Sequence, residues 1–260
     1  MTDPASKIYV EITATRGSTP RDAGTTMIVT PTTTKQTIGG GALEYRAITK
    51  ARKILATGGT ETSETIPLGP NLGQCCGGAV TLRYTYTPKP LSLELDRFTV
   101  HTLTQNRPHP KHLWLWGAGH VGRAVVTAAH PQAFKITWVD SSDDRFPSRI
   151  SKHATKTPAA DMPLLASRAP KYAHHLIFTY SHEIDLALCA ALLKRGAASI
   201  GLIGSETKRA RFFKRLRDMN LDPTPIICPI GDKSLGKHPD QIAHGTLQAL
   251  MSGTQSKALS

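Results

Sequence analysis

The stretch from residue 112 to residue 140 restricts the fold of this chain more than any other. Residues 112–116 have the apolar pattern of a buried strand. Three glycines spaced as Gly-x-Gly-x-x-Gly follow at once: Gly117, Gly119 and Gly122. A helical stretch, 123–129, comes next, and then a second strand, 135–139, that ends at Asp140. Strand, glycine turn, helix, strand and acid in this order predict a Rossmann-like domain with a doubly wound parallel sheet.

Each residue of this fingerprint has a role in binding a nucleotide. Gly117 is expected to allow a tight turn, Gly119 to let the backbone approach a pyrophosphate, and Gly122 to let the helix pack closely. Asp140 is expected to accept a hydrogen bond from a ribose hydroxyl. These four residues form the expected cofactor site of this domain. Whether it binds a nucleotide stays open, because Rossmann domains can lose or exchange their ligand.

The 260 residues suffice for two ordinary domains, and a hydrophobic content of 39% is enough for two cores. Residues 1–88 are expected to form an N-terminal α/β domain with glycine-rich loops. A linker is expected over 89–110, where prolines are frequent. The Rossmann-like domain then occupies 111–251, and residues 252–260 have the polar composition of a disordered tail.

Two glycine-rich segments of the first domain have features of anion-binding loops. Arg16 begins a polar turn between two expected strands, although a plain hairpin connection is the commoner explanation. Gly39, Gly40 and Gly41 open an expected helix, and amide groups at a helix N-terminus suit a phosphate or another oxyanion. The alternative is that these glycines only allow close helix packing.

A third glycine-rich segment contains two adjacent cysteines, and in a compact α/β unit the three segments can share one rim. Its central residues are Gln74, Cys75, Cys76 and Gly77. Neighbouring cysteines rarely form a disulfide with each other, so two free thiols are expected, each able to act as a nucleophile or a soft metal ligand. The alternative is that one or both are small buried hydrophobic residues at a turn.

Composition restricts the setting and the partners. Four cysteines, no Cys-x-x-Cys pair, no charged leader and no apolar run of spanning length indicate a soluble protein of the cytoplasm, with neither a membrane span nor a structural zinc site. The formal net charge is +13. The basic helix expected at 207–217 has an apolar stripe of Phe212, Leu216 and Met219. Its cations favour a solvated or partner-docking face over a nucleic-acid site, because no recognition motif accompanies them.

Six segments together resemble the XdhC/CoxI family of xanthine dehydrogenase accessory proteins. They are 14–21, 37–44, 68–78, 117–122, 201–211 and 228–231. The resemblance implies a chaperone of the molybdenum cofactor rather than an enzyme. Such a protein binds the cofactor, protects it while a cysteine desulfurase supplies the terminal sulfido ligand, and delivers it to apo xanthine dehydrogenase. The family also implies a homodimer.

Under this resemblance, the anionic cofactor would bind Arg16, Arg21 and the amides of Gly39–Gly41. Cys75 or Cys76 would contact molybdenum or relay sulfur as a persulfide. Residues 232–236 depart from the family pattern, which has more glycine and isoleucine there. The alternative function is an NAD(P)-dependent oxidoreductase that uses the Gly117–Gly122 turn, with His120 and His182 as its candidates for acid-base work. For His182, a plain helix-start histidine is the commoner explanation.

Overall fold

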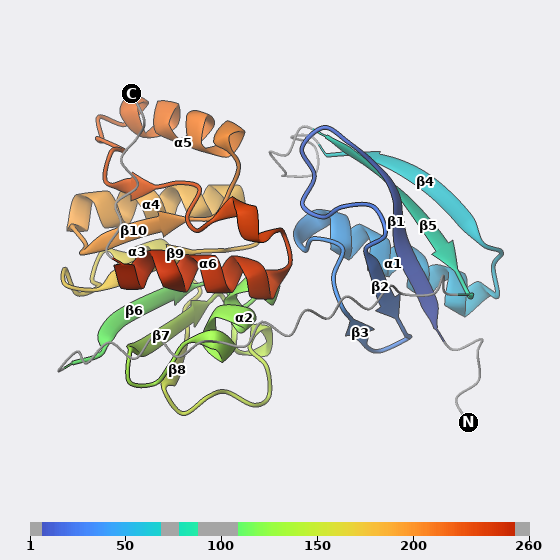
Figure 1. Cartoon of the computed structure of the whole chain (residues 1–260), viewed down its shortest axis with the longest axis horizontal. Helices are drawn as coiled ribbons and strands as arrows, with labels where there is room; N and C mark the ends of the chain where they lie inside the picture. The colour runs from blue at the N-terminus through green and yellow to red at the C-terminus, as the bar shows by residue number, and fades with distance from the viewer. Residues whose placement is uncertain (1–6, 69–77, 88–108, 253–260) are drawn as a thin grey trace. The chain divides into compact units, whose positions relative to one another are not determined.

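The computed structural model describes residues 7–68, 78–87 and 109–252 (Figure 1). The chain divides into two compact units, Met1–Thr99 and Val100–Ser260. The expected linker lies almost wholly outside the described residues, as does the expected tail, so those boundaries stay predictions. Within the described ranges, no helix is both long enough and apolar enough to cross a membrane.

The first unit is an antiparallel sheet with one helix packed on it. The strand order is β3-β2-β1-β5-β4. The elements are β1 (Ile8–Arg16), β2 (Thr26–Val29), β3 (Thr34–Lys35), α1 (Gly41–Thr57), β4 (Thr62–Pro67) and β5 (Ala79–Thr85). As the four-residue apolar repeat predicts, Leu43, Ala47 and Ala51 of α1 are buried in one core with residues of β1 and β5. The helix ends at Gly58, whose φ of 62° is left-handed.

The second unit is a six-stranded parallel sheet with the order β11-β10-β9-β6-β7-β8 (Figure 1). The strands are β6 (Lys111–Trp116), β7 (Phe134–Asp140), β8 (Ala154–Pro158), β9 (His174–Ile177), β10 (Ser199–Leu202) and β11 (Ile226–Ile227). The order reverses between β6 and β9, and open α/β sheets bind ligands beside such a switch point. The predicted Rossmann-like doubly wound fold is confirmed.

Helices cover both faces of this sheet. They are α2 (His120–Ala128), α3 (Met162–Ala166), α4 (His182–Arg195), α5 (Glu206–Asp218) and α6 (Pro239–Ser252), with short 3-10 turns η3 (Asp143–Arg145) and η4 (Lys233–Leu235). Leu113 and Leu115 of β6 belong to the core that contains α2 and α6, whereas Trp116 belongs to the core that contains α3, α4 and α5. Alternate residues of one strand therefore serve opposite layers.

Two details of the expected helices are wrong. Helix α2 begins at His120 rather than at Arg123, because Gly119 already serves as its N-cap. Met219 was expected to extend the apolar stripe of α5, but it is 47% exposed, while Phe213 is buried. Met219 is the C-cap of that helix, so its side chain lies beyond the last turn that faces the core.

His175 on β9 is expected to make the fold sensitive to acid. It is fully buried, and Trp116 Nε1 donates a hydrogen bond to its Nδ1 at 3.2 Å. Burial, with a smaller contribution from His174, lowers the pKa of His175 from 6.5 to about 4. Between these values the unfolded chain binds a proton that the folded chain does not, so the free energy of unfolding falls as the pH falls through that window, by about 3 kcal/mol in total.

The test is urea unfolding of the wild type and of His175→Gln at pH 7, 5.5 and 4. We expect the wild type to lose more stability than the variant as the pH falls, because the variant lacks the titrating ring. Equal losses in the two proteins would show that His175 does not contribute to acid sensitivity.

Candidate functional site

The glycine turn after β6 needs two of its glycines for backbone geometry alone. Gly117 has a φ of +117°, and a Cβ there would lie 2.4 Å from the carbonyl oxygen of Phe178. A Cβ on Gly122 would lie 2.1 Å from the carbonyl oxygen of Gly117. Trp138 Nε1 donates to that same carbonyl at 3.0 Å. The turn is thus held between the first turn of α2 and the neighbouring strands β7 and β9.

Gly119 differs from the other two glycines because its surroundings are open. A Cβ placed on it would meet no heavy atom within 4 Å. Gly119 is the N-cap of α2 and has no side chain to cap that helix, whereas α3, α4 and α5 are capped by Asp161, Ser181 and Ser205. The amide end of α2 therefore suits the close approach of an anionic ligand.

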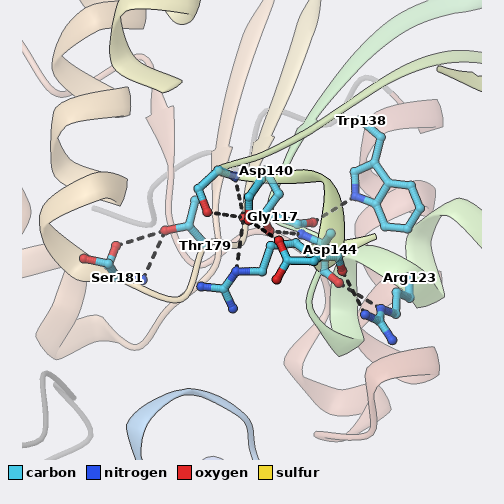
Figure 2. Close-up of polar contacts among 11 residues, drawn as sticks. Gly117, Arg123, Trp138, Asp140, Asp144, Thr179 and Ser181 are labelled. Carbon is cyan, nitrogen blue, oxygen red and sulfur yellow. Dashed lines mark hydrogen bonds and ion pairs between the residues drawn. The ribbon is translucent and has the colours of Figure 1, made fainter. Parts of the chain in front are cut away.

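Asp140 lies against the glycine turn and bonds to its backbone (Figure 2). It is only 3% exposed. Its Oδ2 accepts from the amide of Ala118 at 2.6 Å, and its Oδ1 accepts from the amide of Ser141 at 2.6 Å. The carboxylate expected to bind a ribose hydroxyl is thus engaged within the chain, and it shapes the turn.

Two arginines that the sequence analysis did not single out lie beside this turn. Arg123 donates to the carbonyl oxygens of Ala118 and Arg145, both at 2.9 Å. The guanidinium of Arg145 lies 4.3 Å from the ring centroid of Tyr180, and its Nε lies 4.0 Å from Asp140 Oδ1. Arg145 therefore connects the segment after β7 with the segment after β9, and both arginines add positive charge at the sheet edge.

A buried ion pair lies at the carboxyl ends of β9 and β10. Lys208 Nζ and Asp185 Oδ2 are 2.6 Å apart, and their side chains are 4% and 1% exposed. Asp185 Oδ1 also accepts from the hydroxyl of Thr179 at 2.6 Å. The expectation that the cations of α5 lie on a solvated or docking face is therefore wrong for Lys208, because this side chain is drawn inside by Asp185.

His182, expected as an acid-base candidate or as a simple helix-start residue, is the first residue of α4 and packs edge-on against Phe212. Burial lowers its pKa, and the charge of Lys208 lowers it further.

Figure 2 shows Thr179 and Ser181 on one side of Gly117 and Trp138 and Arg123 on the other. Among the described residues, no group of three or more His, Cys, Asp or Glu side chains is placed to hold a metal ion.

In the first unit, the polar turn that begins at Arg16 contacts both neighbouring glycine segments. A Cβ on Gly39 would lie 2.6 Å from Pro20, and a Cβ on Gly78 would lie 2.3 Å from the carbonyl oxygen of Ser18. Leu68 N donates to Gly78 O at 2.7 Å, which joins the two ends of the cysteine segment. Gln74, Cys75, Cys76 and Gly77 themselves lie outside the described residues.

The triple-glycine segment is held by a buried glutamate, Glu44 of α1. Glu44 Oε2 accepts from the amide of Gly40 and from the amide of Ile38, both at 3.1 Å. The amide of Gly39 donates to the hydroxyl of Thr37 at 3.0 Å, and that hydroxyl donates to Glu44. The amides of Gly39 and Gly40 are therefore not free for an oxyanion, contrary to the expectation from sequence.

Replacing Glu44 with alanine is expected to lower the free energy of unfolding by about 2 kcal/mol, because the buried donors of this segment lose their acceptor. Glu44→Gln is the matched control, since its side-chain oxygen still accepts hydrogen bonds, and it should lose less. Urea unfolding followed by circular dichroism measures both. If the two variants were equally stable, the acceptor role of Glu44 would be refuted.

Comparison with known families gives two matches. Residues 113–247 match the family described as the XdhC Rossmann domain, and residues 7–66 match the XdhC and CoxI family. The first match alone spans more than half of the chain.

One curated relative is the uncharacterized protein YqeB of Escherichia coli K12, which is 26% identical over 93% of this chain. The chain spans only 42% of the length of that relative. A solved structure described as a xanthine dehydrogenase from Bacillus halodurans is 17% identical, with a TM-score of 0.48, and the likeness covers 97% of this chain and 94% of that one. A likeness at this TM-score supports no conclusion about fold or function.

Proposed function

The chain belongs to the XdhC and CoxI family, and on that premise we propose that it binds the molybdenum cofactor, holds it during sulfuration and delivers it to apo xanthine dehydrogenase. Family membership supports the coarser part of this proposal, a role in the maturation of xanthine dehydrogenase. The cargo, the sulfuration step and the cytoplasmic setting are the finer part.

The observation that carries the proposal is the meeting of three glycine-rich segments in the first unit. The turn 16–20 contacts Gly39 through Pro20 and Gly78 through the backbone of Arg16 and Ser18. The side chain of Arg16 is exposed at the end of β1. A guanidinium in this position suits the phosphate of a pterin cofactor through charge-assisted hydrogen bonds.

Two cysteines lie close to Gly78 in the sequence. Cys75 and Cys76 precede Gly78 by three and two residues in the sequence. A thiolate is a soft ligand that suits molybdenum, and it also carries sulfur as a persulfide. We propose that one of these cysteines contacts the metal or receives sulfur from a cysteine desulfurase.

The second candidate function, an NAD(P)-dependent oxidoreductase, is favoured by the open space at Gly119. The Rossmann fold alone does not demonstrate NAD(P) use. Both carboxylate oxygens of Asp140 already accept backbone hydrogen bonds, which makes this side chain less suited to bind the hydroxyl groups of a ribose. Failure to detect nicotinamide nucleotide binding by protein fluorescence would remove this candidate.

The proposed homodimer is tested separately, by sedimentation equilibrium of the purified chain.

A transfer assay tests the leading proposal. Apo xanthine dehydrogenase is incubated anaerobically with molybdenum cofactor and a cysteine desulfurase, with or without this chain, and xanthine oxidation is then measured. The wild type should increase the recovered activity, and Cys75→Ala or Cys76→Ala should reduce that increase. Recovery that is the same with and without the wild-type chain would contradict the proposal.

A further inference from the structure

A groove runs along α4 on the outer surface of the Rossmann-like unit. It has a volume of about 660 Å³ and lies between the segment that follows α3 and the end of α5. The α4 residues that line it recur every three or four positions from Glu183 to Arg195, so they form one face of the whole helix. We call this feature the α4 groove.

The floor of the α4 groove is apolar. It is formed by Ala187, Ala190, Ala191 and Met219; Leu186 also lines the groove but is only 2% exposed. Met219 is 47% exposed, which is high for a large apolar side chain next to other apolar groups. A partner that covers this floor would gain free energy by removing apolar surface from water.

The rim of the α4 groove is positively charged. Lys171 and Lys194 line it and are exposed, and within the described part of the chain neither makes an ion pair or a side-chain hydrogen bond. Arg195 uses its Nε to donate to the carbonyl oxygen of Ala169 at 2.9 Å. Glu183 is the acidic lining residue, and it is neutralised by two bonds from Arg215 at 2.7 and 2.9 Å.

We propose that the α4 groove docks an acidic amphipathic helix of a partner protein. The apolar face of such a helix would cover the floor, and its carboxylates would face Lys171, Lys194 and Arg195. Helix α4 has 14 residues, which corresponds to a length of about 21 Å, so a partner helix of about four turns fits along it. This surface lies outside the glycine and cysteine segments and does not depend on the proposed cargo.

Charge and composition argue for this occupant over two others. A second copy that used this same groove would set its own Lys171, Lys194 and Arg195 against these cations, which is repulsive. Nucleic acid suits a basic surface with aromatic rings on which bases stack, and no aromatic side chain lines this groove. An acidic helix matches both the apolar floor and the cationic rim.

The probe is a fluorescein-labelled synthetic peptide of roughly 18 residues with leucines on one helical face and glutamates on the other. Its binding to the full chain is followed by fluorescence anisotropy. We expect Lys171→Glu/Lys194→Glu to weaken binding by roughly tenfold or more, since two attractions become repulsions. The matched control, Lys53→Glu/Lys152→Glu, makes the same change in net charge at exposed positions outside the groove.

Loss of affinity in the groove variant, with near wild-type affinity in the control, supports the proposal. Equal losses in the two variants overturn it, because binding would then follow net charge alone. No binding to the wild type also overturns it. So does a result in which the groove variant loses only single-stranded DNA binding, or only self-association in sedimentation, because the occupant would then be a nucleic acid or a second copy.

Discussion

Replacing Lys208 with methionine is expected to lower the free energy of unfolding by about 3–5 kcal/mol. The substitution keeps a long side chain but removes the cation that faces Asp185 at 2.6 Å. Asp185 is fully buried, and its hydrogen bonds from Thr179 do not supply a compensating charge. An uncompensated carboxylate in a core is one of the few defects with an effect of this size.

The matched control is Arg215→Met, which removes a cation from the same helix. The side chains of Arg215 and Glu183 are 42% and 72% exposed, so their loss should cost less than about 1 kcal/mol. The double variant Asp185→Leu/Lys208→Met should recover much of the lost stability, because it removes both charges. If Lys208→Met and Arg215→Met unfolded at the same urea concentration, the buried pair would contribute no more to stability than the exposed pair of Arg215 and Glu183.

Gly122→Ala is expected to lower the free energy of unfolding of the Rossmann-like unit by about 4 kcal/mol or more. The new Cβ would lie 2.1 Å from the carbonyl oxygen of Gly117, an atom of the backbone that cannot rotate away. That carbonyl also accepts from Trp138 Nε1, so a shift of the turn would break a buried hydrogen bond.

Gly119→Ala adds the same methyl group three residues earlier and is the control. Nothing lies within 4 Å of its Cβ, so stability should change by less than about 1 kcal/mol. Thermal and urea unfolding compare the two variants. If Gly122→Ala cannot be purified in a folded form, limited proteolysis compares the two variants instead, and Gly122→Ala should be digested much faster than Gly119→Ala. Equal stability would show that the turn relaxes without cost.

The Rossmann-like fold was predictable because its signals are local. Strand, turn, helix and acid follow one another between residues 112 and 140, and each constrains its neighbours along the chain. The burial of Lys208 was not predictable in this way. Its partner Asp185 lies 23 positions earlier on another helix, and only the fold brings the two together. The glycine at position 204 is a weak sequence signal for this burial, because it leaves room for the side chain of Lys208. A Cβ there would lie 2.6 Å from Lys208 Cδ.

The features of the candidate site likewise include some that the sequence predicts and others that depend on the fold. That three glycine-rich segments share one region was expected from their composition, and the contacts of the turn 16–20 with Gly39 and Gly78 agree with it. The engagement of the Gly40 amide by Glu44 was missed, because a glutamate in the first turn of a helix is ordinarily a solvated residue. The stacking of Arg145 on Tyr180 depends on two strands that are distant in sequence.

The most direct test of the account is retention of the cargo. The chain is incubated anaerobically with molybdenum cofactor, desalted, and analysed for bound pterin, using the wild type, Arg16→Glu, Cys75→Ala, Cys76→Ala and the surface control Lys53→Glu. The account predicts retention by the wild type and by Lys53→Glu, and reduced retention by Arg16→Glu and by at least one cysteine variant. No retention by the wild type would contradict the account.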